Sequence, residues 1–373
     1  MMTVLADVID TLTVPGTLVE KLDDDRVRCN ACGHRCVLKP GQRGICKVRF
    51  NRDGVLYVPW GYVAGAQTDP IEKKPFSHFL PGSDALTFGM VGCNFHCDFC
   101  QNWISSQALC DPQAHLSPNN IQRITPRQLV DYAVQTAAQA VVSSYNEPLI
   151  TTEWAVDIFR LAKEAGLKCG FVSDGFATPE TLAYLRPYLD GLKIDLKTMQ
   201  VDQYRQLGGS LEVVLDTIRL AVEMGIWVEV VTLVIPGFND TPEELWDASR
   251  IMASVSRDIP WHVTAFHPDY KMTDHDATPS ASLQQAAEIG EEAGLHYVYA
   301  GNLPGRVGSL ENTYCPQCRQ LLVARRGYQI SAYHLTAEGK CPKCSAKIAG
   351  VWTDKPEDVH LGGWGMPRRA SLF

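Results

Sequence analysis

The chain has 373 residues, of which 45% are hydrophobic and 20% are charged, and its formal net charge is −8. This length and composition are typical of a globular protein with a full hydrophobic core, and the negative balance disfavours general binding of nucleic acid across the surface. No apolar run reaches the roughly 18 residues of a membrane-spanning helix, and the acidic N-terminal segment does not resemble a signal peptide, so we expect a cytoplasmic protein without membrane contacts.

In chain order, the sequence divides into four segments. Residues 1–84 form a lead-in and a cysteine-rich metal module. Residues 85–301 alternate between strand-like and helix-like patterns. Residues 302–352 contain a second cysteine-rich module. Residues 353–373 show no periodicity, and we expect this tail to be poorly ordered.

The segment 85–301 predicts an α/β fold. Apolar strand-like runs alternate with amphipathic helix-like runs, and several helices begin with a Thr-Pro pair, as at residues 125–126, 178–179 and 241–242. This alternation predicts a parallel sheet in a partial, TIM-like (β/α)6 barrel, with its chemistry at the carboxyl ends of the strands. The predicted strands are 86–92, 140–145, 168–173, 191–196, 227–235 and 262–266, with 296–300 as an additional one. The predicted helices are 126–139, 149–165, 179–188, 211–224, 242–256 and 280–293.

Cysteine is unusually frequent, with 13 residues, of which 11 fall into three tight groups. Cytosolic thiols stay reduced, so such groups indicate metal binding rather than disulfides. In the first group we favour a structural zinc site with four thiolates, although His34 could replace one of them and an iron–sulfur cluster is the alternative. The members of this group are Cys29, Cys32, Cys36 and Cys46.

The last group has two CxxC pairs, which is the spacing of a zinc-ribbon-like module. Its members are Cys315, Cys318, Cys341 and Cys344, and a second iron–sulfur cluster is the alternative reading. Residues 306–347 contain seven Lys or Arg against two Asp or Glu. This basic module could bind RNA or an acidic protein, or could simply be a solvated surface.

The central group, Cys93, Cys97 and Cys100, directly follows the first strand of the repeat. Iron–sulfur clusters usually take four thiolates, so three local ones would leave one iron open to a substrate. A zinc site completed by His96 or Cys110 is the alternative.

The central stretch CNFHCDFCQN, with Phe99 before its last cysteine, resembles the motif of radical S-adenosylmethionine (SAM) enzymes, especially the branch with glycyl-radical activating enzymes. The stretches CNACGHRC, DPIEKKPFSHFLPG, YNEP, IPGFND, TAFHPDYKM and GNLPG are similar to the AmmeMemoRadiSam system radical SAM enzymes, which are often labelled pyruvate formate-lyase activating enzyme-like. This second resemblance extends over about residues 25–352. It implies AMMECR- and Memo-family proteins as partners.

The resemblance implies a [4Fe–4S] cluster on the three central cysteines, with SAM bound at the open iron. One electron from a flavodoxin- or ferredoxin-like donor would cleave SAM to methionine and a 5′-deoxyadenosyl radical. That radical would abstract hydrogen from a substrate that the sequence does not identify. The cofactor supplies this chemistry, and the protein positions it.

The resemblance also implies SAM contacts at other strand ends. Glu147 would accept the SAM ammonium, Lys197 beside Asp195 and His267 would meet the SAM carboxylate, and Ser173 and Asp174 would lie near the ribose. Tyr145 and Asn146 stand where the family has glycines, and Val172 stands at an aspartate position of the family's cation site, so that Lys193 could supply the positive charge. The full set of predicted cofactor contacts is Phe99, Asn102, Asn146, Glu147, Ser173, Asp174, Asp195, Lys197 and His267.

Two other functions remain open from the sequence. A glycyl-radical enzyme activase is supported by the motif similarity, whereas the two additional metal modules favour a different substrate. A metal-bearing module that binds RNA or protein without catalysis is the third hypothesis, against which the intact three-cysteine loop and Glu147 argue. The charged loop at residues 69–79 either contacts substrate or forms a salt-bridged rim, and we favour the rim.

Overall fold

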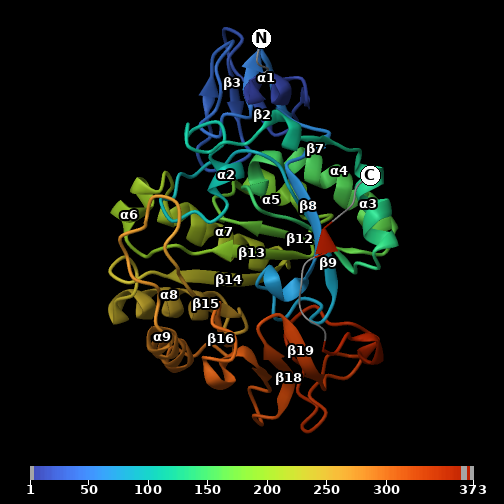
Figure 1. The fold of residues 1–373 in the computed structure, drawn as a ribbon, viewed down its shortest axis with the longest axis vertical. Coiled ribbons are helices and arrows are strands. Elements are labelled where there is room, and N and C mark those ends of the chain that lie inside the picture. Colours follow the sequence, from blue (N-terminus) through green and yellow to red (C-terminus); the bar gives the residue numbers. More distant parts are fainter. Residues whose placement is uncertain (1–3, 363–367, 370–373) are drawn as a thin grey trace.

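In a computed structural model, residues 4–362 and 368–369 are described (Figure 1). A nine-stranded sheet occupies the middle of the molecule, and the small N-terminal strands and the C-terminal strands lie at opposite ends of its long axis. None of the helices in this part of the chain is both long enough and apolar enough to cross a membrane.

The central sheet contains seven parallel strands that lie side by side in chain order. This confirms the seven predicted strands and the prediction of parallel strands with helical crossovers. An antiparallel strand, β8 (Gly65–Pro70), extends the sheet beyond β9, and β20 (Arg368–Arg369) pairs with β8 at the edge. The parallel strands are β9 (Asp84–Gly89), β11 (Ala140–Ser143), β12 (Lys168–Ser173), β13 (Gly191–Asp195), β14 (Trp227–Val234), β15 (Trp261–Ala265) and β16 (Val298–Gly301).

Six helices that connect these strands form a continuous row against the sheet, since each contacts the next and most contact a strand. Thr125, Thr178 and Thr241 cap three of them by accepting a backbone N–H with the side-chain oxygen, as their Thr-Pro pairs predict. An additional short helix, α6 (Val201–Gln206), was not predicted. The six are α3 (Pro126–Gln135), α4 (Thr152–Glu164), α5 (Pro179–Leu185), α7 (Leu211–Glu223), α8 (Pro242–Val255) and α9 (Ser280–Glu292).

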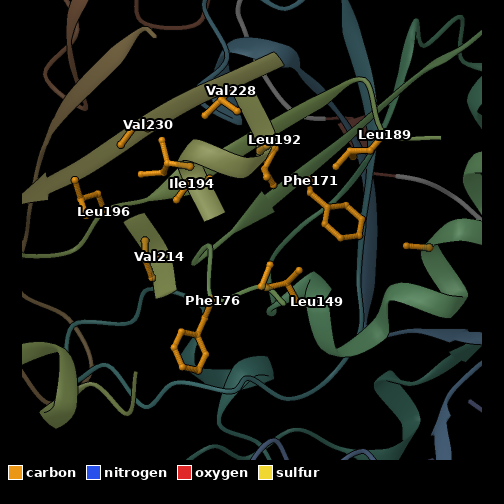
Figure 2. Close-up of a cluster of buried hydrophobic side chains, with 14 of the residues drawn as sticks. Leu149, Phe171, Phe176, Leu189, Leu192, Ile194, Leu196, Val214, Val228 and Val230 are labelled. Carbon is orange, nitrogen blue, oxygen red and sulfur yellow. The ribbon is translucent and has the colours of Figure 1, made fainter. Parts of the chain in front are cut away.

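The main core lies between the strands and this row of helices (Figure 2). Phe171 of β12, Ile194 of β13 and Val230 of β14 are fully buried, and Val214 of α7 packs in the same cluster. Fully burying a side chain of this size contributes about 1.5–3 kcal/mol. The apolar strand residues therefore fix the sheet, and the polar residues that follow them are left at its carboxyl edge.

The N-terminal segment forms one short helix and two three-stranded antiparallel sheets. The fully buried Arg49 anchors it to α4, because its guanidinium donates to both carboxylate oxygens of Glu153 at 2.7 Å. The elements are α1 (Leu5–Asp10), β1 (Thr13–Pro15), β2 (Val19–Lys21), β3 (Val27–Cys29), β4 (Val37–Leu38), β5 (Phe50–Arg52) and β6 (Val55–Pro59), followed by β7 (Tyr62–Val63), which pairs with β10 (Gln122–Arg123).

The C-terminal module is a three-stranded antiparallel sheet made of β17 (Thr313–Tyr314), β18 (Leu321–Arg326) and β19 (Gln329–Tyr333). Of the tail that we expected to be poorly ordered, residues 353–362 contain a short 3-10 helix, Pro356–Asp358. Residues 363–367 and 370–373 of that tail lie outside the described residues.

Candidate active site

A cavity of about 450 Å³ opens where the parallel strands end. It is lined from several strand ends and from the loop after β9, which is where a parallel α/β sheet is expected to carry its chemistry. The structure brings eleven of the twelve predicted central-site residues to this cavity. They are Cys93, Cys97, Phe99, Cys100, Asn102, Asn146, Glu147, Ser173, Asp174, Asp195 and Lys197.

The three central cysteines share one cavity wall. Burial raises the pKa of Cys93 well above its usual value and that of Cys97 to about 12, so a bare thiolate is disfavoured there unless a metal neutralises it. Within residues 4–362, no compact set of ligand atoms joins these thiols to His96 or Cys110. This finding gives no support to the alternative of a zinc site completed by either residue.

Glu147 is held firmly by its own surroundings. Its Oε1 accepts from the Ser173 hydroxyl at 2.7 Å and from the Leu149 N–H at 2.9 Å, and its Oε2 accepts from the Asp174 N–H at 2.8 Å. Burial, followed by the charge of Asp174, raises the pKa of Glu147. The residue therefore caps the 3-10 helix Pro148–Thr151 and at the same time places a carboxylate on the cavity wall.

Asp174 is the carboxylate next to Glu147, and one of its oxygens has no hydrogen-bond partner. Its Oδ1 accepts from the Phe176 N–H at 3.0 Å, while its buried Oδ2 has no hydrogen-bond partner. Burial raises the pKa of Asp174 to about 6. A buried acceptor without a donor is costly, so this oxygen is suited to an ammonium or hydroxyl of a ligand.

Two lysines share one carboxylate on the neighbouring strand. Asp195 pairs with Lys193, and the Lys197 ammonium lies 3.2 Å from its other oxygen. Although burial opposes it, the two ammonium groups lower the pKa of Asp195 to about 2. Lys197 also lies 6.0 Å from the centre of the Phe99 ring. The three groups carry one net positive charge, which suits an anionic ligand group.

The turn before Glu147, which contains Tyr145 and Asn146, has an unusual backbone conformation. Tyr145 has φ of 70°, a left-handed conformation that glycine adopts readily and other residues rarely do. Asn146 accepts the Met90 N–H through its side chain at 2.8 Å, which ties the segment to the end of β9. The left-handed Tyr145 and the side chain of Asn146 therefore shape the turn that precedes Glu147.

His267 is the predicted site residue that does not line the cavity. It is exposed, and its Nε2 lies 3.0 Å from the side-chain nitrogen of Gln101, which does line the cavity. His267 is therefore connected to the cavity through the side chain of Gln101.

The part of the cavity lining that comes from the loop at residues 69–79 and from the C-terminal module is called the far wall. The sequence predicted a rim or a substrate contact for the loop and did not predict the contribution of the C-terminal module. Glu72, Lys73 and Lys74 of the charged loop line the far wall, and Lys74 is buried with its ammonium 2.6 Å from Asp69. The loop is thus salt-bridged, as expected of a rim, but it faces the cavity. Beside this loop, the C-terminal module contributes Arg325, whose guanidinium donates to the Ser77 carbonyl at 2.7 Å.

A buried polar network supports this far wall. Glu229 of β14 accepts from the backbone N–H groups of Ser77 and His78 and lies 2.7 Å from His262 of β15. The Tyr299 hydroxyl of β16 joins His78 to the C-terminal module. A glutamate and a histidine inside otherwise apolar strands were the signal in the sequence, because buried strands rarely carry them without partners.

The two outer cysteine groups differ in spacing. The C-terminal sulfurs all lie within 4.8 Å of one another, with Cys315–Cys344 at 3.5 Å and Cys318–Cys341 at 3.6 Å. A single ion with metal–sulfur bonds of about 2.3 Å holds its sulfurs roughly 3.8 Å apart. The C-terminal group can therefore hold one metal ion. The N-terminal sulfurs, which belong to Cys29, Cys32, Cys36 and Cys46, are not drawn together so tightly within the described range 4–362.

Comparison with known proteins agrees with this site. The chain matches the Radical SAM superfamily model over residues 88–250, and it is an enzyme of the radical SAM class. A radical SAM domain implies SAM and a [4Fe–4S] cluster. The three cavity-facing thiols, the unpaired Asp174 oxygen and the lysine pair are residues that fit these two groups.

The chain is similar to an uncharacterized protein, to an activating enzyme and to a domain of another activating enzyme. The chain is 39% identical over 335 residues to the uncharacterized protein MJ0808 of Methanocaldococcus jannaschii, covering 88% of this chain and 97% of that protein. It is 28% identical over 184 residues to the pyruvate formate-lyase 2-activating enzyme of Escherichia coli, covering 46% of this chain and 62% of the activating enzyme. A domain of a pyruvate-formate lyase-activating enzyme from Bacteroides vulgatus is similar with a TM-score of 0.40 and 21% identity, over 44% of this chain and 100% of that domain.

Proposed function

We propose that this enzyme reductively cleaves SAM and uses the resulting 5′-deoxyadenosyl radical to abstract hydrogen from a substrate. The observation that carries the proposal is one cavity that gathers three cysteines, of which Cys97 is buried, two buried carboxylates and a lysine pair. When bound by Cys93, Cys97 and Cys100, the [4Fe–4S] cluster supplies the electron and an open iron.

The chain's own residues bind and orient SAM in this proposal. Asp174 accepts a hydrogen bond from the SAM amino group with its unpaired Oδ2, and the Glu147 carboxyl group lies beside it. Lys197, positioned by Asp195, meets the SAM carboxylate. The hydroxyl of Ser173 orients Glu147.

The remaining predicted contacts have lesser roles. Asn146 fixes the turn before Glu147. Phe99 and Asn102 shape the wall beside the cysteines. His267 reaches the site through Gln101.

For the architecture, we propose that the seven parallel strands curve into a partial, TIM-like barrel spanning residues 85–301, flanked by modules at 1–84 and 302–352. The C-terminal quartet holds a structural Zn²⁺ in a ribbon-like module, which is supported by the tight sulfur spacing. A flavodoxin- or ferredoxin-like protein supplies electrons in the cytoplasm. The similarity to AmmeMemoRadiSam system enzymes suggests AMMECR- and Memo-family partners, and the basic C-terminal module offers a surface for RNA or an acidic protein.

A glycyl-radical activase is the second candidate function, because several activating enzymes are among the relatives. The far wall favours a smaller substrate. Arg325 and Tyr328 of the C-terminal module and the loop at residues 69–79 line the cavity together, and their charged and polar groups suit a small polar substrate.

The test is SAM cleavage by the anaerobically reconstituted protein with titanium(III) citrate. We expect methionine and 5′-deoxyadenosine in equal amounts. Absence of 5′-deoxyadenosine, under conditions where a known activating enzyme produces it, contradicts both enzymatic functions. Adding a glycyl-radical enzyme and looking for its radical signal separates the activase from the first proposal.

A further inference from the structure

We propose that the N-terminal quartet, Cys29, Cys32, Cys36 and Cys46, binds a second iron–sulfur cluster that delivers electrons to the central site. The sequence alone favoured zinc for this group. The spacing of its sulfurs, their surroundings and their contact with the central loop support a cluster instead. The metal assignment stands by itself, whereas the electron-transfer role rests on the proposed function.

In the described residues, the four sulfurs do not form a set that could hold one metal ion. They nevertheless belong to one compact segment, because the Cys29 N–H donates to the Cys36 carbonyl at 2.9 Å. Four thiolates of a cluster bind different irons and stand farther apart than around one zinc ion.

The central cysteines provide an internal standard for this spacing. They line one cavity together, and in the described residues they too do not form a set that could hold one metal ion, unlike the C-terminal quartet. The N-terminal quartet therefore matches the chain's expected cluster site and differs from its expected zinc site.

The space beside two of the sulfurs is kept clear by glycine. A Cβ at Gly44 would lie 3.6 Å from Cys36 Sγ and 3.7 Å from Cys46 Sγ. A side chain at this position would occupy the volume next to these sulfurs. A cluster, which carries four irons and four sulfides, needs that volume more than a single ion does.

A buried cation complements the negative charge of the thiolates. The Nε of Arg49, which is 1% exposed, donates to Cys29 Sγ at 3.2 Å, while its other nitrogens donate to Glu153. Hydrogen bonds to cluster sulfurs raise the reduction potential by stabilising the reduced, more negative state. Arg49 is thus placed to tune an electron carrier.

The quartet lies directly against the central cysteine loop. The ring of His34 is 3.0 Å from the carbonyl oxygen of Asn94, the residue after Cys93. The Cys46 carbonyl would lie 2.9 Å from a Cβ at Gly92, the residue before Cys93. The His34 ring also lies 4.9 Å from the ring of Phe176, which lies 5.3 Å from the ring of Phe95 in the central loop.

This contact defines the electron path. A reduced one-electron donor of the ferredoxin or flavodoxin class is oxidised, and its electron enters the N-terminal cluster. The same electron then passes to the central cluster, where SAM consumes it. No proton or group moves in this transfer.

Metal content of the wild-type protein, purified anaerobically without reconstitution, tests the assignment first. We expect about eight irons, eight sulfides and one zinc per chain. Two zincs with at most about four irons overturn the inference. This measurement needs no variant and is unaffected by any folding defect.

Variants then separate the two clusters. The triple variant Cys93→Ala/Cys97→Ala/Cys100→Ala should keep about four irons and a reducible cluster signal in electron paramagnetic resonance, and Cys29→Ser/Cys46→Ser should lose about four irons. Cys169→Ala, a buried cysteine outside all three groups, is the control and should keep all the iron. A triple variant with no iron overturns the inference. A cluster in the triple variant, together with a wild type that does not cleave SAM, upholds the metal assignment while the proposed function fails.

The electron role has its own readout. With reduced flavodoxin, Cys29→Ser/Cys46→Ser should cleave SAM at least about tenfold more slowly than wild type. With titanium(III) citrate, which reaches the central cluster directly, its rate should stay close to wild type. Equal loss with both reductants contradicts the relay.

Discussion

The C-terminal and central cysteine groups show how similar cysteine spacings can build different sites. The C-terminal sulfurs lie within 4.8 Å of one another, and backbone N–H groups of Cys344 and Lys343 lower the pKa of Cys341 to about 7, although burial opposes this. The central thiols instead face a cavity with buried carboxylates and lysines. Cysteine spacing indicates a metal, but the neighbouring side chains decide whether that metal can meet a substrate.

Removing one central thiol is the strongest test of this difference. Cys97→Ala should abolish SAM cleavage, with a loss of about 1,000-fold or more, because the cluster loses a required ligand. Liquid chromatography with mass spectrometry of 5′-deoxyadenosine gives the measurement, and Cys169→Ala is the matched control. Full cleavage by Cys97→Ala with a normal cluster spectrum contradicts the assignment of the three ligands.

Removing one C-terminal thiol should have a structural effect only. Cys315→Ala should release about one zinc per chain and lower the melting temperature by about 5 °C or more, since metal binding folds so small a module. The absorption spectrum of the central cluster should stay intact. If Cys315→Ala lost the absorption of the central cluster while circular dichroism still showed a folded protein, the C-terminal and central sites would not be independent.

A smaller effect is expected from the carboxylate with the unpaired oxygen. Asp174→Asn should weaken SAM binding about 10- to 100-fold, because a charge-assisted hydrogen bond contributes about 1.5–3 kcal/mol. Equilibrium dialysis measures the affinity, iron content should not change, and the exposed Asp216→Asn is the control. If Asp174→Asn bound SAM as tightly as the wild type while Glu147→Gln bound it more weakly, Glu147 alone would accept a hydrogen bond from the SAM amino group.

The smallest effect concerns stability at the far wall. Burial raises the pKa of Glu72 from 4.5 to about 7, so its contribution to stability is present below about pH 4.5 and is lost as the pH rises through 7. Glu72→Gln keeps an acceptor for the Gly82 N–H and does not ionise. In urea unfolding, the free energy of unfolding of Glu72→Gln relative to that of the wild type should rise between pH 5 and pH 8 by on the order of 3 kcal/mol. A difference in unfolding free energy that stays constant across this pH range contradicts a raised pKa of Glu72.

The central fold was readable from the sequence because its signals are local. Apolar runs of strand length, Thr-Pro helix starts and polar strand ends each lie within a few residues, and they located the seven parallel strands and the edge of the sheet where the cavity opens. Glu147 and Asp174 were predicted from the resemblance to radical SAM enzymes, and the structure places Asp174 directly after β12 and Glu147 four residues after the end of β11.

The far wall could not be read in this way because it depends on contacts between distant segments. Arg325 donates to the carbonyl of Ser77, 248 positions away, and brings the C-terminal module against the charged loop. No local pattern records that approach, so the loop was expected at a rim. The unpaired oxygen of Asp174 is likewise a property of the packed site rather than of its sequence.

The most direct measurement of the central claim is electron–nuclear double resonance on the reduced central cluster with SAM labelled with ¹⁵N at its amino group. The triple variant's spectrum identifies the signal of any other cluster. We predict a ¹⁵N coupling that shows the SAM amine bound to the open iron, and its absence in the triple variant. A wild-type cluster that shows no coupling with SAM bound would contradict an open site between the three cysteines.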